Sequence, residues 1–378
     1  MRKSYLDNIR WSVVIVVVVY HVFYMYNAEG LLGVAGPVTN QRVQYQDLFL
    51  YIVYPWIMAV LFIVSGICAR YSLGRRTPKE FLRDRTTRLL VPSTVGLFAF
   101  QFLQGYVNMA LGGAFETMAG VPAVGKYFIM AVSGIGPLWY IQLLWLFSVL
   151  LLLVRKVDKD RLWNACRSTT APVLVLLAVP VWAAAQVLNM PIIVVYRFGF
   201  YGFLFLLGYF VFSHDEVIDR VKAWFPLFAA AAVALGAAFC VRYFGENYAD
   251  VPVNRTPLFL GYSWFACLAI LGGMARFGDR STSATRWLGA HSFGLYMLHY
   301  LGISAVALFL AKPGLLPVWA IYPVTLLAGF AAGYLLYAII SRVPYYRWAV
   351  LGLPAKKVKP AKEAPHVSGQ SGPASKAE

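Results

Sequence analysis

The sequence predicts an all-α protein, a polytopic bundle of about ten transmembrane helices with both termini in the cytoplasm. Three observations support this fold class. Apolar residues make up 60% of the 378 residues and charged residues only 13%, a charged share about half that of a typical soluble domain. Several apolar runs reach about twenty residues, the length that crosses a bilayer. Lys and Arg are concentrated on one side of the predicted membrane.

The ten predicted spans alternate in direction. Only six Lys or Arg residues fall in the segments opposite the N-terminus, and the other 27 of the 33 lie on the N-terminal side. This asymmetry follows the positive-inside rule and places both termini in the cytoplasm. Topology therefore explains the net charge of +17, and we expect no nucleic-acid partner. The predicted spans are residues 9–27, 48–69, 88–108, 136–154, 171–189, 196–213, 224–243, 257–275, 288–311 and 316–341.

The remaining composition fits a multi-pass protein of the cell (inner or plasma) membrane, with the lipid bilayer as a partner. The four cysteines show no CxxC spacing, so they suggest neither a disulfide framework nor a zinc site. No small-residue cleavage motif follows the first apolar run, so we expect an uncleaved span. We expect a transmembrane domain over residues 1–345 and a disordered basic tail, rich in Pro, Ala and Lys, over residues 346–378.

The first span carries two residues that point to function, Arg10 at its inner rim and His21 well inside. Eleven residues make about three helical turns, so the two side chains lie on one face about 16 Å apart along the axis. A histidine in hydrocarbon is costly and indicates a functional site. Imidazole titrates near neutral pH, which suits proton transfer.

The second span ends in a small pair, Ser65-Gly66, near the inner face. Small side chains permit close approach of either another helix or a ligand, and both alternatives stay open. In the loop that follows, Thr77, Pro78 and Glu80 have the spacing of a helix start with a capping box.

Arginines dominate this inner loop, and four of them, Arg75, Arg76, Arg85 and Arg88, form a candidate site. Arg85 and Arg88 are three residues apart and therefore neighbours on one helix face. The cluster has two interpretations. It either faces lipid phosphates as topogenic charge or binds a phosphorylated cofactor, for which arginine forks are suited.

The later spans add further polar candidates. Trp139 and Gln142 lie in the opening segment of the fourth span. Trp139 is at about the depth of His21, where it belongs to an interfacial aromatic belt or contacts a substrate. His299 is a second intramembrane histidine, about 12 Å further in than His291, and the alternative role is a neutral bridge between helices. No Asp or Glu lies deep in a span, which argues against a carboxylate-based proton pump and against a metal site. The sequence assigns no structure to residues 108–135, and a return toward the membrane is one alternative.

Five motifs, in order and at matching topological places, resemble those of the membrane acyltransferase 3 family over about residues 1–345. Within that family the chain is most similar to the branch that succinylates periplasmic glucans, in a stand-alone form without an added hydrolase-like domain. The motifs are Tyr5-Leu6-Asp7-x-Ile9-Arg10 followed by His21, Phe62-x-x-Ser65-Gly66, Arg85-x-x-Arg88-Leu89-Leu90-x-Pro92, Leu138-Trp139-Tyr140 and Leu295-Tyr296-x-x-His299.

The resemblance implies transfer of an acetyl or succinyl group from acyl-CoA to a hydroxyl, often on an exported glycan, without a metal. It implies that His21 is the general base, with a covalent acyl-imidazole as the competing role. Arg10, oriented by Asp7, would hold the donor phosphate or thioester arm. The remaining implied roles are nucleotide and diphosphate binding by Arg75, Arg76, Arg85 and Arg88, admission of the pantetheine arm at Ser65-Gly66, and substrate binding by Trp139, Gln142 and His299.

Two other functions remain open from the sequence. A transporter or flippase for an anionic or lipid-linked glycan would share the arginine cluster and the polar core. An acyltransferase of the same family that acts on a lipid or small molecule would differ only in its acceptor pocket, which uses generic aromatic and amide groups. The sequence determines neither the acceptor nor the oligomeric state.

Overall fold

The computed structural model describes residues 3–30, 33–39, 43–190 and 193–355. Within these ranges the chain forms helices and no strand, so the all-α prediction is confirmed. Eight helical segments are long and apolar enough to cross a bilayer, which makes this a multi-pass membrane protein. They are Ser4–Met25, Tyr45–Leu73, Pro78–Leu111, Gly136–Asp158, Phe225–Tyr243, Pro257–Phe277, Ser283–Ala311 and Val318–Ile340.

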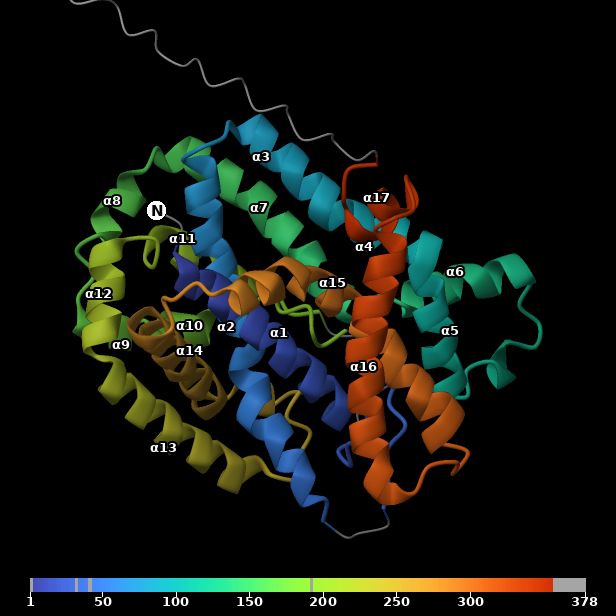
Figure 1. The fold of residues 1–378 in the computed structure, drawn as a ribbon. Helices are drawn as coiled ribbons and strands as arrows, with labels where there is room; N and C mark the ends of the chain where they lie inside the picture. The colour runs from blue at the N-terminus through green and yellow to red at the C-terminus, as the bar shows by residue number, and fades with distance from the viewer. Residues whose placement is uncertain (1–2, 31–32, 40–42, 191–192, 356–378) are drawn as a thin grey trace, which may run out of the picture.

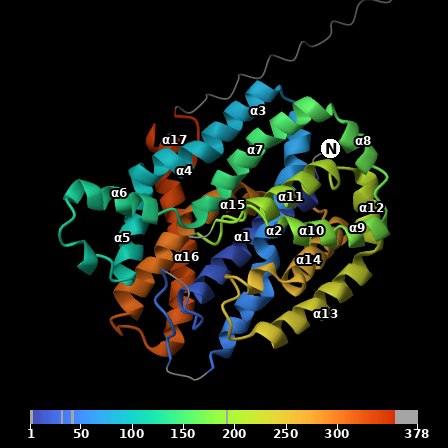
Figure 2. The same ribbon diagram turned by 180° about the vertical axis from the view of Figure 1, so that it is seen from behind.

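Helix α1 (Ser4–Met25) crosses the middle of the bundle, in contact with α2 (Leu48–Leu73), α15 (Ser283–Val306) and α16 (Val318–Ile340) (Figure 1). Its apolar residues give it partners on several sides, so His21, in its second half, lies inside the protein, whereas Arg10 near its start is exposed. The view from behind shows α7 (Trp139–Asp158) and α11 (Phe198–Phe210) near α2 (Figure 2). Helices α8 (Arg161–Cys166), α12 (Asp215–Ala223) and α13 (Phe225–Tyr243) lie at the edge of the bundle (Figure 1). Helix α14 (Pro257–Phe277) packs between α13 and α2 and also contacts α1.

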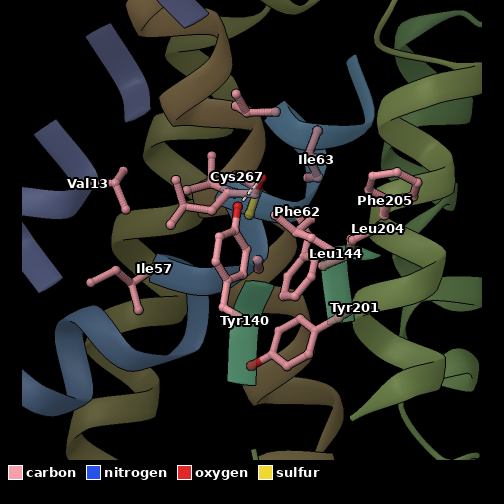
Figure 3. Packing of buried hydrophobic residues seen from close by; sticks show 14 of the residues in the cluster. Val13, Ile57, Phe62, Ile63, Tyr140, Leu144, Tyr201, Leu204, Phe205 and Cys267 are labelled. Carbon is pink, nitrogen blue, oxygen red and sulfur yellow. Dashed lines mark hydrogen bonds between the residues drawn. The ribbon is translucent and has the colours of Figure 1, made fainter. Parts of the chain in front are cut away.

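The core between α2, α7 and α11 is aromatic and tightly packed (Figure 3). The Phe62 ring lies 4.6 Å from the Tyr201 ring and 4.8 Å from the Tyr140 ring, centroid to centroid. The backbones of α2 and α11 also lie close together at Gly66. A Cβ added to Gly66 would lie only 2.0 Å from the Phe205 carbonyl oxygen of α11. Gly208 of α11 faces α2 in the same way. The close approach at Gly66 is thus made by a helix, one of the two alternatives that the sequence left open.

The loop after α2 begins a helix at Thr77, as the spacing of Thr77, Pro78 and Glu80 predicts. The Glu80 amide donates to Thr77 Oγ1 at 3.3 Å and the Thr77 amide donates to Glu80 Oε2 at 2.9 Å, which completes the capping box. The helix runs on to Leu111, so the predicted third span starts ten residues earlier than 88. It consists of α3 (Pro78–Arg85), α4 (Val91–Gly96) and α5 (Phe102–Leu111), joined by π-helical turns at Thr86–Leu90 and Leu97–Gln101.

Two predicted spans are shorter than expected. The span predicted at 171–189 is broken into α9 (Ala171–Leu176) and α10 (Ala178–Ala184). Pro180 has no amide hydrogen to donate to the carbonyl four residues earlier, which accounts for the break. The span predicted at 196–213 is reduced to α11, at Phe198–Phe210. Neither reaches the length of the eight candidate spans.

Two other segments differ from the sequence-based outline. Residues 123–133, which the sequence left unassigned, form α6 (Ala123–Ser133), and its backbone packs against Gly105 of α5. The chain also continues past the predicted domain end at 345 with α17 (Tyr346–Leu351), whose last three residues are buried against α4. The disorder predicted for the tail falls mainly on 356–378, outside the described residues.

Candidate active site

A cavity of about 460 Å³ lies beside the second half of α1 and is bounded by the loops at that end of the bundle. His21 lines it, together with Val17, Tyr20 and Tyr24 from the same helix face. These four residues are spaced three or four apart, so an α-helix projects them to one side. Other polar or aromatic lining residues are Tyr54, Asn108, Trp139, Asn247, Asp250, Tyr296 and Tyr300.

Aromatic rings surround the His21 imidazole. The Tyr300 ring meets it edge-on at 5.0 Å and the Tyr20 ring at 5.3 Å, centroid to centroid. Trp139 belongs to the same cavity, so the structure brings together His21 and one of the predicted substrate contacts. A cavity of this size, largely aromatic with a few polar groups, suits a small organic ligand.

The second intramembrane histidine contacts the first. His299 Nε2 lies 3.1 Å from His21 Nδ1, and the rings are 5.0 Å apart between centroids. His21 Nδ1 also lies 2.8 Å from the Val17 carbonyl oxygen, and His299 Nδ1 lies 3.0 Å from the Leu295 carbonyl oxygen. His299 is fully buried, so it bridges α1 and α15 behind the cavity wall.

Arg10 lies nearer the N-terminus of α1, away from the cavity. Its guanidinium is 3.8 Å from the Asp7 carboxylate, consistent with the predicted neighbourhood of the pair. Arg10 is also within electrostatic range of Arg85, Cys68 and Tyr140. Arg10 and Arg85 are thus close enough to form a cationic pair, and neither lines the His21 cavity.

A second cavity, of about 550 Å³, lies at the end of the bundle near α3 and α17 (Figure 1). Arg75, Arg76, Arg83 and Arg88 line it, and we call it the arginine groove. Asp84 fixes two of them, since its carboxylate is 3.2 Å from Arg76 Nη1 and 2.9 Å from Arg88 Nε. Three of the four predicted cofactor arginines thus meet in one groove.

Arg85 does not join them, although the sequence placed it on one face with Arg88. Its guanidinium lies over the Phe81 ring at 5.1 Å and faces the interior, whereas Arg88 is exposed. The π-helical turn at Thr86–Leu90 is the physical reason, because each of its residues turns less than in an α-helix, so the three-residue spacing separates the side chains.

Two predicted site residues have structural partners outside both cavities. Gln142 donates from Nε2 to the Ser93 carbonyl oxygen at 2.9 Å and accepts from the Tyr196 hydroxyl. Ser65 Oγ lies 2.9 Å from the Tyr140 hydroxyl oxygen. Gln142 therefore ties α7 to the preceding span and to the loop before α11, and Ser65 ties α2 to α7.

Sequence reasoning missed several lining residues. Tyr20 and Tyr24 carried a usable signal, since they share the helix face of His21. Arg83 also carried one, because Glu80, Arg83 and Thr87 recur at helical spacing on one face. Tyr296 carried one as well, since it belongs to the motif that contains His299, whereas Tyr54 comes from another helix and carried no such signal.

A pair of acidic residues lies beside the His21 cavity, in the loop after α1 and at the start of α2. Asp47 accepts from the Ala28 amide at 2.9 Å and from Gln44 Nε2 at 2.8 Å. The Tyr51 hydroxyl donates to Glu29 Oε1 at 3.3 Å. Burial, with Asp47 nearby, raises the pKa of Glu29 to about 7. The neighbouring residue Gly30 lines the cavity.

This shift predicts a pH-dependent stability. Between pH 4.5 and about 7 the folded protein keeps a proton on Glu29 that the unfolded chain releases, so stability falls as pH rises through this window. Glu29→Gln should flatten that dependence and stabilise the protein at pH 8 by about 1–2 kcal/mol, after a discount for solvent screening. Thermal unfolding in detergent at pH 5 and pH 8 measures it. The exposed Glu116→Gln variant is the control, and identical pH profiles for Glu29→Gln and wild type would contradict the assignment.

Comparison with known proteins adds an independent finding. A family model described as an acyltransferase domain matches residues 3–338. Glucans biosynthesis protein C of Escherichia coli O1:K1 / APEC is 22% identical over 381 residues, covering 94% of this chain and 96% of that protein. The protein of the same name from Escherichia coli (strain UTI89 / UPEC) has the same identity and coverage. No solved structure matches. Because the family match covers most of the chain, including every residue that lines the His21 cavity, the chain belongs to the acyltransferase 3 family of membrane acyltransferases.

Proposed function

We propose that this acyltransferase moves an acetyl or succinyl group from a cytoplasmic acyl-CoA to a hydroxyl of an extracytoplasmic glycan. The observation that carries the proposal is the pairing of two cavities, a histidine-containing aromatic one and the arginine groove. They share no lining residue, and of the two only the aromatic cavity is lined by α1. The uneven distribution of Lys and Arg supports a cytoplasmic arginine groove, an inner-membrane location and the ten-span topology with both termini inside.

The arginine groove is suited to the phosphates of the donor. Arginine presents several N–H donors in a planar fork, which match phosphate oxygens with charge-assisted hydrogen bonds. Asp84 holds Arg76 and Arg88 in place before a ligand arrives. Arg10 and Arg85 continue the positive potential inward, so the thioester arm would extend past them, and past Ser65 and Tyr140, toward His21.

The His21 cavity is suited to the acceptor. Aromatic side chains such as Trp139 and Tyr54 offer flat apolar faces for a sugar ring, and Asn108, Asn247 and Asp250 offer polar partners for its hydroxyls. The similarity to glucans biosynthesis protein C favours a glucan-like acceptor over a lipid or small molecule.

The chemical step needs one base. His21 Nε2 takes the proton from the acceptor hydroxyl as its oxygen attacks the thioester carbon. The new C–O ester bond forms, the C–S bond breaks, and the same proton passes from His21 to the leaving CoA thiolate. The products are the acylated acceptor and CoA, and His21 returns to its starting state.

Removal of groove arginines should weaken donor binding specifically. For the double variant Arg76→Ala with Arg88→Ala, we expect acyl-CoA to bind about 10–100-fold more weakly, because charge-assisted hydrogen bonds are lost and Asp84 is left to repel phosphate. Titration of CoA against purified protein measures it. Arg242→Ala is the matched control, since Arg242 pairs with Glu246 elsewhere. Equal CoA affinity in the double variant and wild type would exclude the groove as the nucleotide site.

The function itself is tested with purified protein in liposomes, labelled acetyl-CoA or succinyl-CoA inside, and a linear glucan oligosaccharide outside. Acylated glucan outside and free CoA inside are expected. Transport of intact lipid-linked glycan without any cleavage of either thioester would instead support the flippase alternative. Cleavage of the thioester with label transferred only to lipid would show that the acceptor is a lipid and not a glycan.

A further inference from the structure

The hydrogen bonds of the His21–His299 pair determine where each imidazole carries its proton. A neutral imidazole has one N–H donor and one acceptor nitrogen. His299 Nδ1 lies 3.0 Å from the Leu295 carbonyl oxygen, which can only accept, so Nδ1 carries the proton. His299 Nε2 is therefore an acceptor, and it points at α1.

The same logic fixes His21. Its Nδ1 lies 2.8 Å from the Val17 carbonyl oxygen and 3.1 Å from His299 Nε2. Both partners are acceptors, so His21 Nδ1 must be the donor and is shared between them. The lone pair of the neutral His21 ring is consequently on Nε2, the nitrogen that the proposed reaction needs as its base.

We infer that His299 is a positioning residue that holds His21 in the tautomer with the proton on Nδ1 and the basic lone pair on Nε2. The inference rests on the proposed role of His21 as base and adds the residue that prepares it. His299 is fully buried and does not line the cavity, so it acts through His21 rather than on the substrate.

Val17 alone would hold His21 less well. Its carbonyl belongs to the same helix turn, so this bond fixes the ring only relative to α1. His299 comes from α15, 278 residues away in the chain, and its hydrogen bond fixes the His21 ring relative to that second helix. A partner on the second ring nitrogen is the usual way in which proteins select a histidine tautomer.

The pair also fits the charge change during transfer. When Nε2 takes the acceptor proton, His21 becomes an imidazolium whose Nδ1–H faces the His299 Nε2 lone pair at 3.1 Å. That hydrogen bond then becomes charge-assisted and stronger. The proton returns through Nε2 to the CoA thiolate, so both rings end neutral. The group that accepts the hydrogen bond from His21 Nδ1 is the His299 imidazole. It has the orienting role that a carboxylate has in other arrangements of base and nucleophile.

The test separates hydrogen-bond orientation from packing. His299→Gln keeps a side-chain oxygen able to accept near the Nε2 position, whereas His299→Leu keeps bulk without an acceptor. We expect His299→Leu to lower the transfer rate constant about 10–100-fold with little change in KM for acyl-CoA, and His299→Gln to recover most of it. Both variants are assayed for release of CoA from acetyl-CoA and succinyl-CoA with a linear glucan oligosaccharide as acceptor.

A second readout does not depend on activity. Ring-nitrogen NMR shifts of isotope-labelled histidine in bilayers report the tautomer, and the His21 signals among the five histidines are assigned from their loss in His21→Gln. Wild type and His299→Gln should show His21 protonated on Nδ1, and His299→Leu a mixture of tautomers. An unchanged His21 tautomer in His299→Leu overturns the inference, whatever the activity. If the wild type shows the expected tautomer but transfers no acyl group, the proposed function fails and the positioning inference stands.

Discussion

Replacing His21 with glutamine is expected to lower acyl transfer by about 10²–10⁴-fold while leaving the helical bundle folded. Glutamine is similar in length and retains hydrogen-bonding groups beside Val17 and His299, but its amide does not take up a proton at working pH. The acceptor hydroxyl would then have to attack without a base. Release of CoA in single turnovers, with acyl-CoA in excess over its KM, measures the chemical step rather than donor binding.

A matched control comes from the same membrane domain. His291 bonds to the Trp287 carbonyl of its own helix at 2.8 Å and does not line the His21 cavity. His291→Gln should therefore keep transfer close to the wild-type rate. Comparable activity in His21→Gln and wild type would remove His21 from the mechanism.

The same variants distinguish a base from a covalent carrier. An acyl-imidazole on His21 would leave label from acyl-CoA on denatured wild-type protein, in proportion to enzyme and absent from His21→Gln. A general base predicts no such label in either protein, while CoA release is still lost in the variant. The bond between His21 Nδ1 and His299 leaves Nε2 free for either role, so the label on denatured protein decides between them.

Local signals in the sequence predicted local structure well. Thr77, Pro78 and Glu80 marked a helix start because a capping box involves residues only three apart. The depth of His21 and its distance from Arg10 followed from helical geometry alone, since α1 runs unbroken from Ser4 to Met25. Three of the four predicted cofactor arginines meet in the arginine groove because they are close along the chain.

What the sequence could not supply were contacts between distant segments and departures from regular geometry. His21 and His299 meet only because α1 packs on α15, and no spacing in the sequence encodes that pairing. Arg85 turns away from Arg88 at a π-helical turn that residue types do not announce. Gly66 had two interpretations, and only the position of α11 distinguishes between them.

Gly66→Ala is expected to destabilise the protein by about 2–4 kcal/mol, because the added methyl group overpacks a closed helix contact. Its Cβ would lie 2.0 Å from the Phe205 carbonyl oxygen and 3.0 Å from the Gly208 Cα. Both are backbone atoms, so no side chain can rotate away and α2 and α11 must separate. The measurement is the apparent melting temperature and the yield of monodisperse protein in detergent.

Gly74→Ala is the control at the end of the same helix. A Cβ there meets its nearest atoms at 3.6 Å and 3.7 Å, ordinary contact distances. Its stability should match wild type, which isolates the effect of crowding from that of removing a glycine. If Gly66→Ala were instead as stable as wild type but bound acyl-CoA poorly, Gly66 would serve the donor arm. If Gly66→Ala is less stable but its folded fraction binds CoA normally, Gly66 serves helix packing and not donor binding. Donor binding is then left to the arginines of the groove.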